Sequence, residues 1–127
     1  MKKYIIVFIF CLINAYIFAA GASEESIREK YNHSYFPNRE EWVYEFNSVA
    51  AEVSKYCKDI ISGESWSTSF DKMQFDESCL KYKVLLDIGV EKKYINEEIK
   101  KFQLEKLSQE REKVSKFLSK SSGLGIE

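Results

Sequence analysis

The sequence has 127 residues, which is enough for one small domain. It carries 19 basic and 20 acidic side chains, so it lacks the basic excess that a dedicated nucleic-acid-binding protein shows. A single histidine excludes a multi-histidine metal site, and five glycines leave little material for a glycine-rich phosphate loop. We therefore expect no nucleic acid, metal ion or cofactor among its ligands.

Residues 1–22 have the pattern of a secretory signal peptide. Two lysines follow the initiating methionine, an almost wholly apolar stretch comes next, and Ala-Gly-Ala at 20–22 supplies the small residues that a signal peptidase accepts. We expect cleavage before Ser23 and a periplasmic or secreted mature chain, with no other membrane segment. An uncleaved anchor is the alternative, because the apolar run is only slightly shorter than a spanning helix.

Two cysteines remain after this cleavage, because Cys11 leaves with the signal peptide. In an oxidising compartment we expect Cys57 and Cys79 to form a disulfide, because each is then the only intramolecular partner for the other. Closing this loop would stabilise the fold by roughly 3 kcal/mol in the chain-entropy model. Free thiols or an intermolecular bond are the alternatives.

The first long helix is expected at 39–62. It follows a polar and then aromatic segment at 23–37, whose start could form one or two helical turns. Asn38 and Glu41 have the spacing of a capping box, and Gly63 fits the position just after a helix end. Apolar residues between them recur at intervals of three and four. This stripe comprises Val43, Phe46, Ala50, Val53, Cys57 and Ile60, widened by Trp42, Val49 and Tyr56.

The remaining sequence predicts two further helices. Residues 64–75 are interpreted as an aromatic loop with at most two helical turns, and a second helix is expected from a cap at Asp76 to a stop at Gly89. A third helix is expected over 90–120, either continuous or broken near Asn96, and 121–127 are expected to form a flexible tail. In that third helix the first half is expected to be packed and the second half largely solvated. The packed stripe comprises Tyr94, Ile95, Ile99 and Phe102.

These elements predict an all-α, disulfide-stapled bundle of three to four helices after a cleaved signal peptide, with the helical domain at 38–120. Catalysis is not expected. The lone His33 lies in a loop where nothing positions a nucleophile or an oxyanion hole. Adjacent carboxylates on a helix point about 100° apart and do not converge on one bond.

The candidate partner-binding residues are the loop aromatics, because rigid aromatic side chains are favoured contacts at protein interfaces. Their alternative role is to cover the edge of the core. In size, export and two-cysteine helical design, the chain resembles small periplasmic helical proteins that neutralise an envelope-acting partner, such as immunity proteins for cell-wall amidases. The resemblance implies a non-catalytic inhibitor or modulator of a partner protein in the cell envelope. The loop aromatics are Tyr31, Tyr35, Phe36 and Trp66.

Two other hypotheses remain. A structural or assembly component would use the C-terminal helix to pair with a second copy or with a secretion apparatus, so a homodimer is a further expectation. A small envelope hydrolase would depend on one acidic residue, for which Glu64 is the candidate. The apolar positions available for the assembly role are Leu107, Val114, Phe117 and Leu118.

Overall fold

A computed structural model describes residues 23–32, 35–63 and 67–126, with side chains described up to Lys120. The predicted signal peptide, His33, Glu64 and Trp66 lie outside the described residues. Within the described ranges the chain forms four helices and no strand, which confirms the all-α prediction. The helices are α2 (Glu24–Lys30), α3 (Arg39–Ser62), α4 (Thr68–Glu91) and α5 (Glu97–Ile126).

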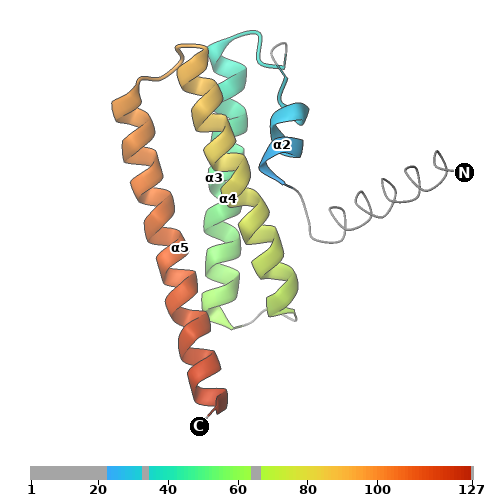
Figure 1. Ribbon diagram of the computed structural model, residues 1–127, viewed down its shortest axis with the longest axis vertical. Coiled ribbons are helices and arrows are strands. Elements are labelled where there is room, and N and C mark those ends of the chain that lie inside the picture. Colours follow the sequence, from blue (N-terminus) through green and yellow to red (C-terminus); the bar gives the residue numbers. More distant parts are fainter. Residues whose placement is uncertain (1–22, 33–34, 64–66, 127) are drawn as a thin grey trace, which may run out of the picture.

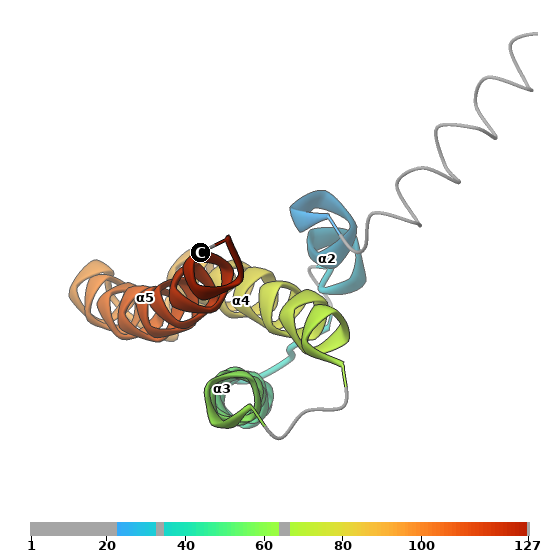
Figure 2. The same cartoon turned by 90° about the horizontal axis from the view of Figure 1, so that it is seen from below.

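The three long helices form an up-and-down bundle to which the short helix α2 is added. Helices α3 and α4 are antiparallel, and α5 returns alongside them with its C-terminal end beyond the adjacent ends of α3 and α4 (Figure 1). Seen along the bundle, α4 has α2, α3 and α5 around it (Figure 2). Helix α2 packs against α4 and against no other described helix. Helix α4 is therefore the centre of the fold.

Helix α3 begins and ends where the sequence predicts. The Asn38 side chain accepts a hydrogen bond from the Glu41 backbone N–H at 2.9 Å, and Gly63 ends the helix in the left-handed conformation at φ 70°. The apolar stripe is confirmed, but the buried side of the helix is centred nearer Trp42 and Val49 than the intervals of three and four residues predict. Six residues of the helix are buried: Trp42, Phe46, Val49, Val53, Cys57 and Ile60.

Helix α4 begins earlier than the sequence predicts. Its cap is Ser67, whose hydroxyl accepts a hydrogen bond from the Phe70 backbone N–H, and not Asp76. Asp76 lies inside the helix and pairs with Lys72 one turn before it, at 2.6 Å. The buried Phe75 extends the core-facing side of the helix toward its N-terminus, so packing stabilises turns that their serine-rich sequence leaves ambiguous.

Gly89 lies inside α4 and does not end it. A Cβ added there would lie 2.6 Å from Cζ2 of Trp42 and 3.0 Å from Cγ1 of Ile95. The Trp42 ring is fixed at this place because it stacks on Phe46, with 5.3 Å between ring centroids, and donates Nε1–H to the Leu85 carbonyl at 2.8 Å. Close approach of the indole, and not a helix stop, therefore requires the glycine.

Helix α4 ends in a Schellman motif. The Tyr94 backbone N–H donates to the Gly89 carbonyl at 2.8 Å, and the Lys93 N–H donates to the Val90 carbonyl at 3.0 Å. Lys93 occupies the left-handed position of this motif with φ 63°. A side chain with a Cβ in that conformation costs roughly 1–2 kcal/mol, which glycine avoids.

Replacing Lys93 with glycine is therefore expected to raise the free energy of unfolding by about 1 kcal/mol. The matched control is Glu91→Gly, two residues earlier, where the backbone is helical and glycine should destabilise by about 0.5–1 kcal/mol. Urea unfolding followed by circular dichroism measures both. Equal destabilisation by the two variants would contradict the left-handed cap.

The predicted packing is confirmed for Tyr94 and Ile95, just before α5, but it is reversed along the helix itself. Leu107 and Val114 in its second half are buried, at 2% and 1% exposure, whereas Ile99 and Phe102 near its start are 43% and 55% exposed. The first turns of α5 lie at the outer side of the bundle, and its later turns cross toward α3 (Figure 1, Figure 2). The helix continues to Ile126, so most of the segment expected as a flexible tail is helical.

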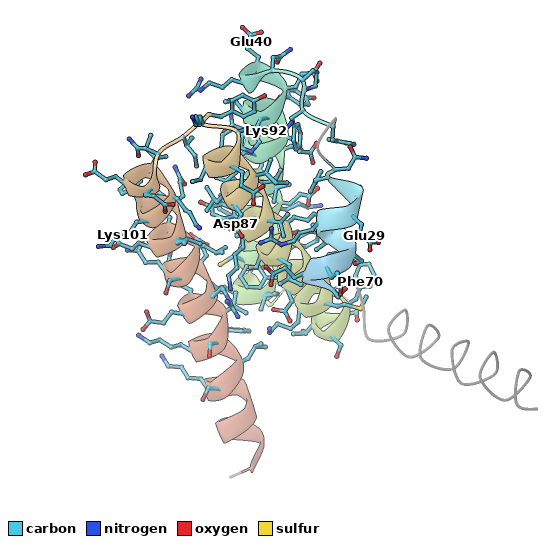
Figure 3. All side chains as sticks on the ribbon, turned by 45° about the horizontal axis from the view of Figure 1, so that its top comes forward. Glu29, Glu40, Phe70, Asp87, Lys92 and Lys101 are labelled. Carbon is cyan, nitrogen blue, oxygen red and sulfur yellow. The ribbon has the colours of Figure 1, made fainter. Side chains whose placement is uncertain are left out.

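One carboxylate connects three helices. Asp87 on α4 forms an ion pair with Arg28 of α2, and its other oxygen lies 2.7 Å from Nζ of Lys100 on α5. The hydrogen bond to Asp87 raises the pKa of Lys100 above its usual value. Figure 3 shows Asp87 on the side of α4 that faces α2. The two cations thus fasten α2 and the start of α5 to the central helix.

Candidate functional site

The residues that connect α2 to α3 form an aromatic cluster. Tyr31 ends α2, and both Tyr31 and Phe36 are buried, with 5.5 Å between their ring centroids. The Tyr31 hydroxyl donates to Glu45 of α3 at 3.0 Å. Burial first, and then this hydrogen bond, raise the pKa of Tyr31 well above its usual range. Both residues therefore belong to the core, in the covering role that was the alternative to partner binding.

Tyr35 is the member of this cluster that reaches the surface. Its side chain is 45% exposed, and its ring makes edge-to-face contacts with Tyr31 at 5.3 Å and with Phe36 at 4.9 Å between centroids. Such arrangements are the preferred geometry of aromatic pairs. Two buried rings therefore hold Tyr35 in place while part of its ring stays open to solvent.

A surface hollow separates Tyr35 from a second exposed tyrosine, Tyr44 of α3. Tyr44 is 78% exposed, and the hollow has a volume of about 410 Å³. We call it the Tyr35–Tyr44 groove. Figure 3 shows Glu40 at the outer end of α3, where this groove lies. The described lining contains three glutamates and no basic side chain: Glu40, Glu41 and Glu45, together with Phe36 and Asn38.

Sequence reasoning missed Tyr44, although a signal for it exists. Tyr44 falls outside the apolar stripe of α3, whereas the neighbouring Val43 and Phe46 lie on it. An aromatic residue on the polar side of an amphipathic helix has no core to fill, which makes it a candidate contact residue. Of the four predicted partner-binding residues, only Tyr35 lies on the described surface beside Tyr44.

The predicted disulfide is not formed: Cys57 and Cys79 are free and buried. The reason is the register of the helix pair, since α4 begins well before the expected cap. Cys57 lies about one and a half turns from the α3–α4 turn and Cys79 about three turns, which separates them along the bundle by roughly 9 Å. A disulfide requires Cα atoms within about 7 Å of each other.

The two thiols are in chemically inert surroundings. Cys57 donates its S–H to the Glu110 carbonyl at 3.8 Å. Burial raises the pKa of Cys57 to about 12 and that of Cys79 to about 11, so neither forms a thiolate at neutral pH. The described residues also contain no group of three histidine, cysteine, aspartate or glutamate side chains placed to hold a metal ion.

A reductant is accordingly expected to leave the melting temperature of the protein unchanged. A thiol-specific reagent should react with Cys57 and Cys79 only after denaturation, because both are buried and protonated in the folded state. Calorimetry with and without reductant, and a thiol titration in native and denaturing buffer, measure the two effects. A fall of several degrees on reduction, as a disulfide contributing roughly 3 kcal/mol would give, would contradict the register.

No helix in the described part of the chain combines the length and the apolar character needed to cross a membrane. Comparison with known proteins gives no match: no family model matches the chain, and neither a curated protein nor a solved structure is significantly similar to it. Its function is therefore inferred from its own surface features.

Proposed function

We propose that this chain is an exported, non-catalytic binding protein that inhibits or modulates a partner protein in the cell envelope, and that it binds this partner through the Tyr35–Tyr44 groove. The observation that carries the proposal is the pair of exposed tyrosine rings that line one hollow. Tyrosine provides a large contact area at a low cost in conformational entropy, and it is enriched among residues that dominate binding energy.

The groove is already ordered for binding. Buried rings hold Tyr35 from behind, and Tyr44 projects from the first turns of a long helix. Rigid contact residues lose little freedom on association, which favours affinity. The glutamates around the rings give this face a negative potential, which favours a partner with a basic surface.

Export remains part of the proposal, and the start of α2 is compatible with it. Ser23 and Ser26 form a closed capping box, in which each backbone N–H donates to the other residue's hydroxyl at 3.1–3.2 Å. Cleavage before Ser23 would keep both hydrogen bonds, because the new terminal ammonium group still donates. Helix α2 therefore needs no residue upstream of Ser23 for its cap.

The test uses the full-length chain with a C-terminal tag, produced in its own host. Intact mass of the purified protein is expected to show loss of residues 1–22. Wild-type protein and two variants, Tyr44→Ser and Phe102→Ser, are then compared as bait in a quantitative capture from the envelope fraction. Both replaced residues are exposed aromatics on helices, so the variants are matched in chemistry and differ in location.

The proposal requires one envelope protein to be recovered at constant stoichiometry with wild type and Phe102→Ser, and lost with Tyr44→Ser. The purified partner should then lose activity when wild-type protein is added. The opposite pattern, with recovery lost in Phe102→Ser and kept in Tyr44→Ser, would support the alternative role in assembly. That role cannot use Leu107 or Val114, which are buried, and would depend on the exposed Ile99 and Phe102.

A further inference from the structure

A second hollow lies between helices α4 and α5, and nothing in the proposed function uses it. Its volume is about 740 Å³, within the range of small-molecule sites. We call it the α4–α5 groove. Its walls combine apolar, hydroxyl, basic and acidic side chains, which include Phe75, Asp76, Lys83, Arg111, Glu112 and Ser115.

The groove exists because α5 carries small and charged residues where its apolar stripe would continue. Leu107 and Val114 fill the core at an interval of seven residues. Ser108 and Ser115 each follow one of them, so they lie on the same side of the helix and also line the groove. Their short side chains leave space that a leucine at either position would fill.

Two of the basic side chains that line the groove have no ion-pair partner among the described residues. Lys72 pairs with Asp76 at 2.6 Å and Glu112 pairs with Lys116 at 3.0 Å, so these charges balance within their own helices. Neither Lys83 nor Arg111 forms an ion pair with any described residue. The groove therefore has two free positive charges, one from each helix.

The two cations face the same hollow, because both line the groove, Lys83 from α4 and Arg111 from α5. Lys83 is half-buried, so its ammonium group has less contact with solvent than that of an exposed lysine. A charge in such a position is stabilised by a counter-charge, which the described part of the chain does not supply.

We propose that the α4–α5 groove binds a small amphiphilic anion, in which a carboxylate or phosphate group lies between Lys83 and Arg111 and an alkyl chain lies along Phe75 and Leu118. The serine hydroxyls supply additional hydrogen-bond donors for the anionic group. Carboxylate and phosphate are the groups for which charge-assisted hydrogen bonds from arginine and lysine are strongest. This inference is independent of the proposed partner protein.

The test is isothermal titration calorimetry, in which the purified protein is titrated with monomeric laurate. We expect saturable binding of one laurate per chain, and binding at least about tenfold weaker in the double variant Lys83→Gln/Arg111→Gln, which removes two charge-assisted contacts. The control is Lys58→Gln/Lys101→Gln, which removes the same charge from exposed positions outside the groove lining and should bind as wild type does.

A second variant tests the hollow itself. Ser115→Leu should fill the groove and abolish laurate binding while the circular dichroism spectrum and the melting temperature are kept or improved. Ser119→Leu places the same side chain on the same helix outside the groove lining and should leave binding unchanged. If a folded Ser115→Leu variant still binds laurate as tightly as wild type, the ligand does not bind in the α4–α5 groove.

Two sources of the anion are distinguished by a parallel experiment with vesicles of phosphatidylglycerol. Laurate binding that depends on Lys83 and Arg111 supports a free amphiphile, and vesicle binding with the same dependence supports a lipid head group. Absence of saturable binding in both experiments, or equal weakening in the charge-matched control, overturns the proposal.

Discussion

Alanine at position 89 is expected to destabilise the protein by about 2 kcal/mol, although alanine normally favours a helix over glycine by about 1 kcal/mol. The new methyl group would lie 2.6 Å from the Trp42 ring. The ring cannot move away freely, because it stacks on Phe46 and donates a hydrogen bond to the Leu85 carbonyl. Urea unfolding of Gly89→Ala measures the cost.

A double-mutant cycle identifies the contact responsible. Trp42→Phe removes the distal ring atoms that crowd position 89, so Gly89→Ala should cost less in that background by about 1 kcal/mol. Gly63→Ala is the matched control, because Gly63 has a positive φ but no atom of the described residues lies near its Cβ position. Its cost of about 1 kcal/mol should be the same with Trp42 or with phenylalanine at position 42. Additive costs at positions 42 and 89 would contradict the close approach.

Leu107→Ala is expected to cost about 2–5 kcal/mol, whereas Phe102→Ala should change the free energy of unfolding by less than about 0.5 kcal/mol. Leu107 is 2% exposed between α5 and the rest of the bundle, and Phe102 is 55% exposed under the Lys106 ammonium group. The apolar stripe in the sequence predicts the reverse order. Equilibrium unfolding of both variants decides between them, and a larger loss for Phe102→Ala would contradict the observed packing of α5.

The sequence predicts α3 well because its signals are local. Asn38 and Gly63 act through hydrogen bonds and backbone angles within a few residues, and the buried face repeats regularly over the whole helix. The extent of α4 is set by tertiary contacts that no local pattern contains. Phe75 is buried at one end, and the ring of Trp42 from another helix occupies the space beside Gly89.

The candidate site could be predicted only in part, for a related reason. Tyr31, Tyr35 and Phe36 are all aromatic residues of the segment before Pro37, and which of them is covered depends on tertiary packing that no local pattern contains. The disulfide prediction failed because it depended on where α4 begins, and an error of about two and a half turns moves Cys79 away from Cys57. Tyr44 could have been found from its position off the helix stripe.

The attachment of α2 has a consequence for the order in which the chain acquires structure during synthesis. Of the described helices, α2 is synthesised first, but the surface that receives it belongs to α4, and Asp87 lies 59 residues after Arg28. The hairpin of α3 and α4 needs only contacts across a short turn, which form faster than contacts that close a long loop. The first of the described helices to be synthesised is therefore the last to find its packing surface, because that surface is complete only after α4 has been made.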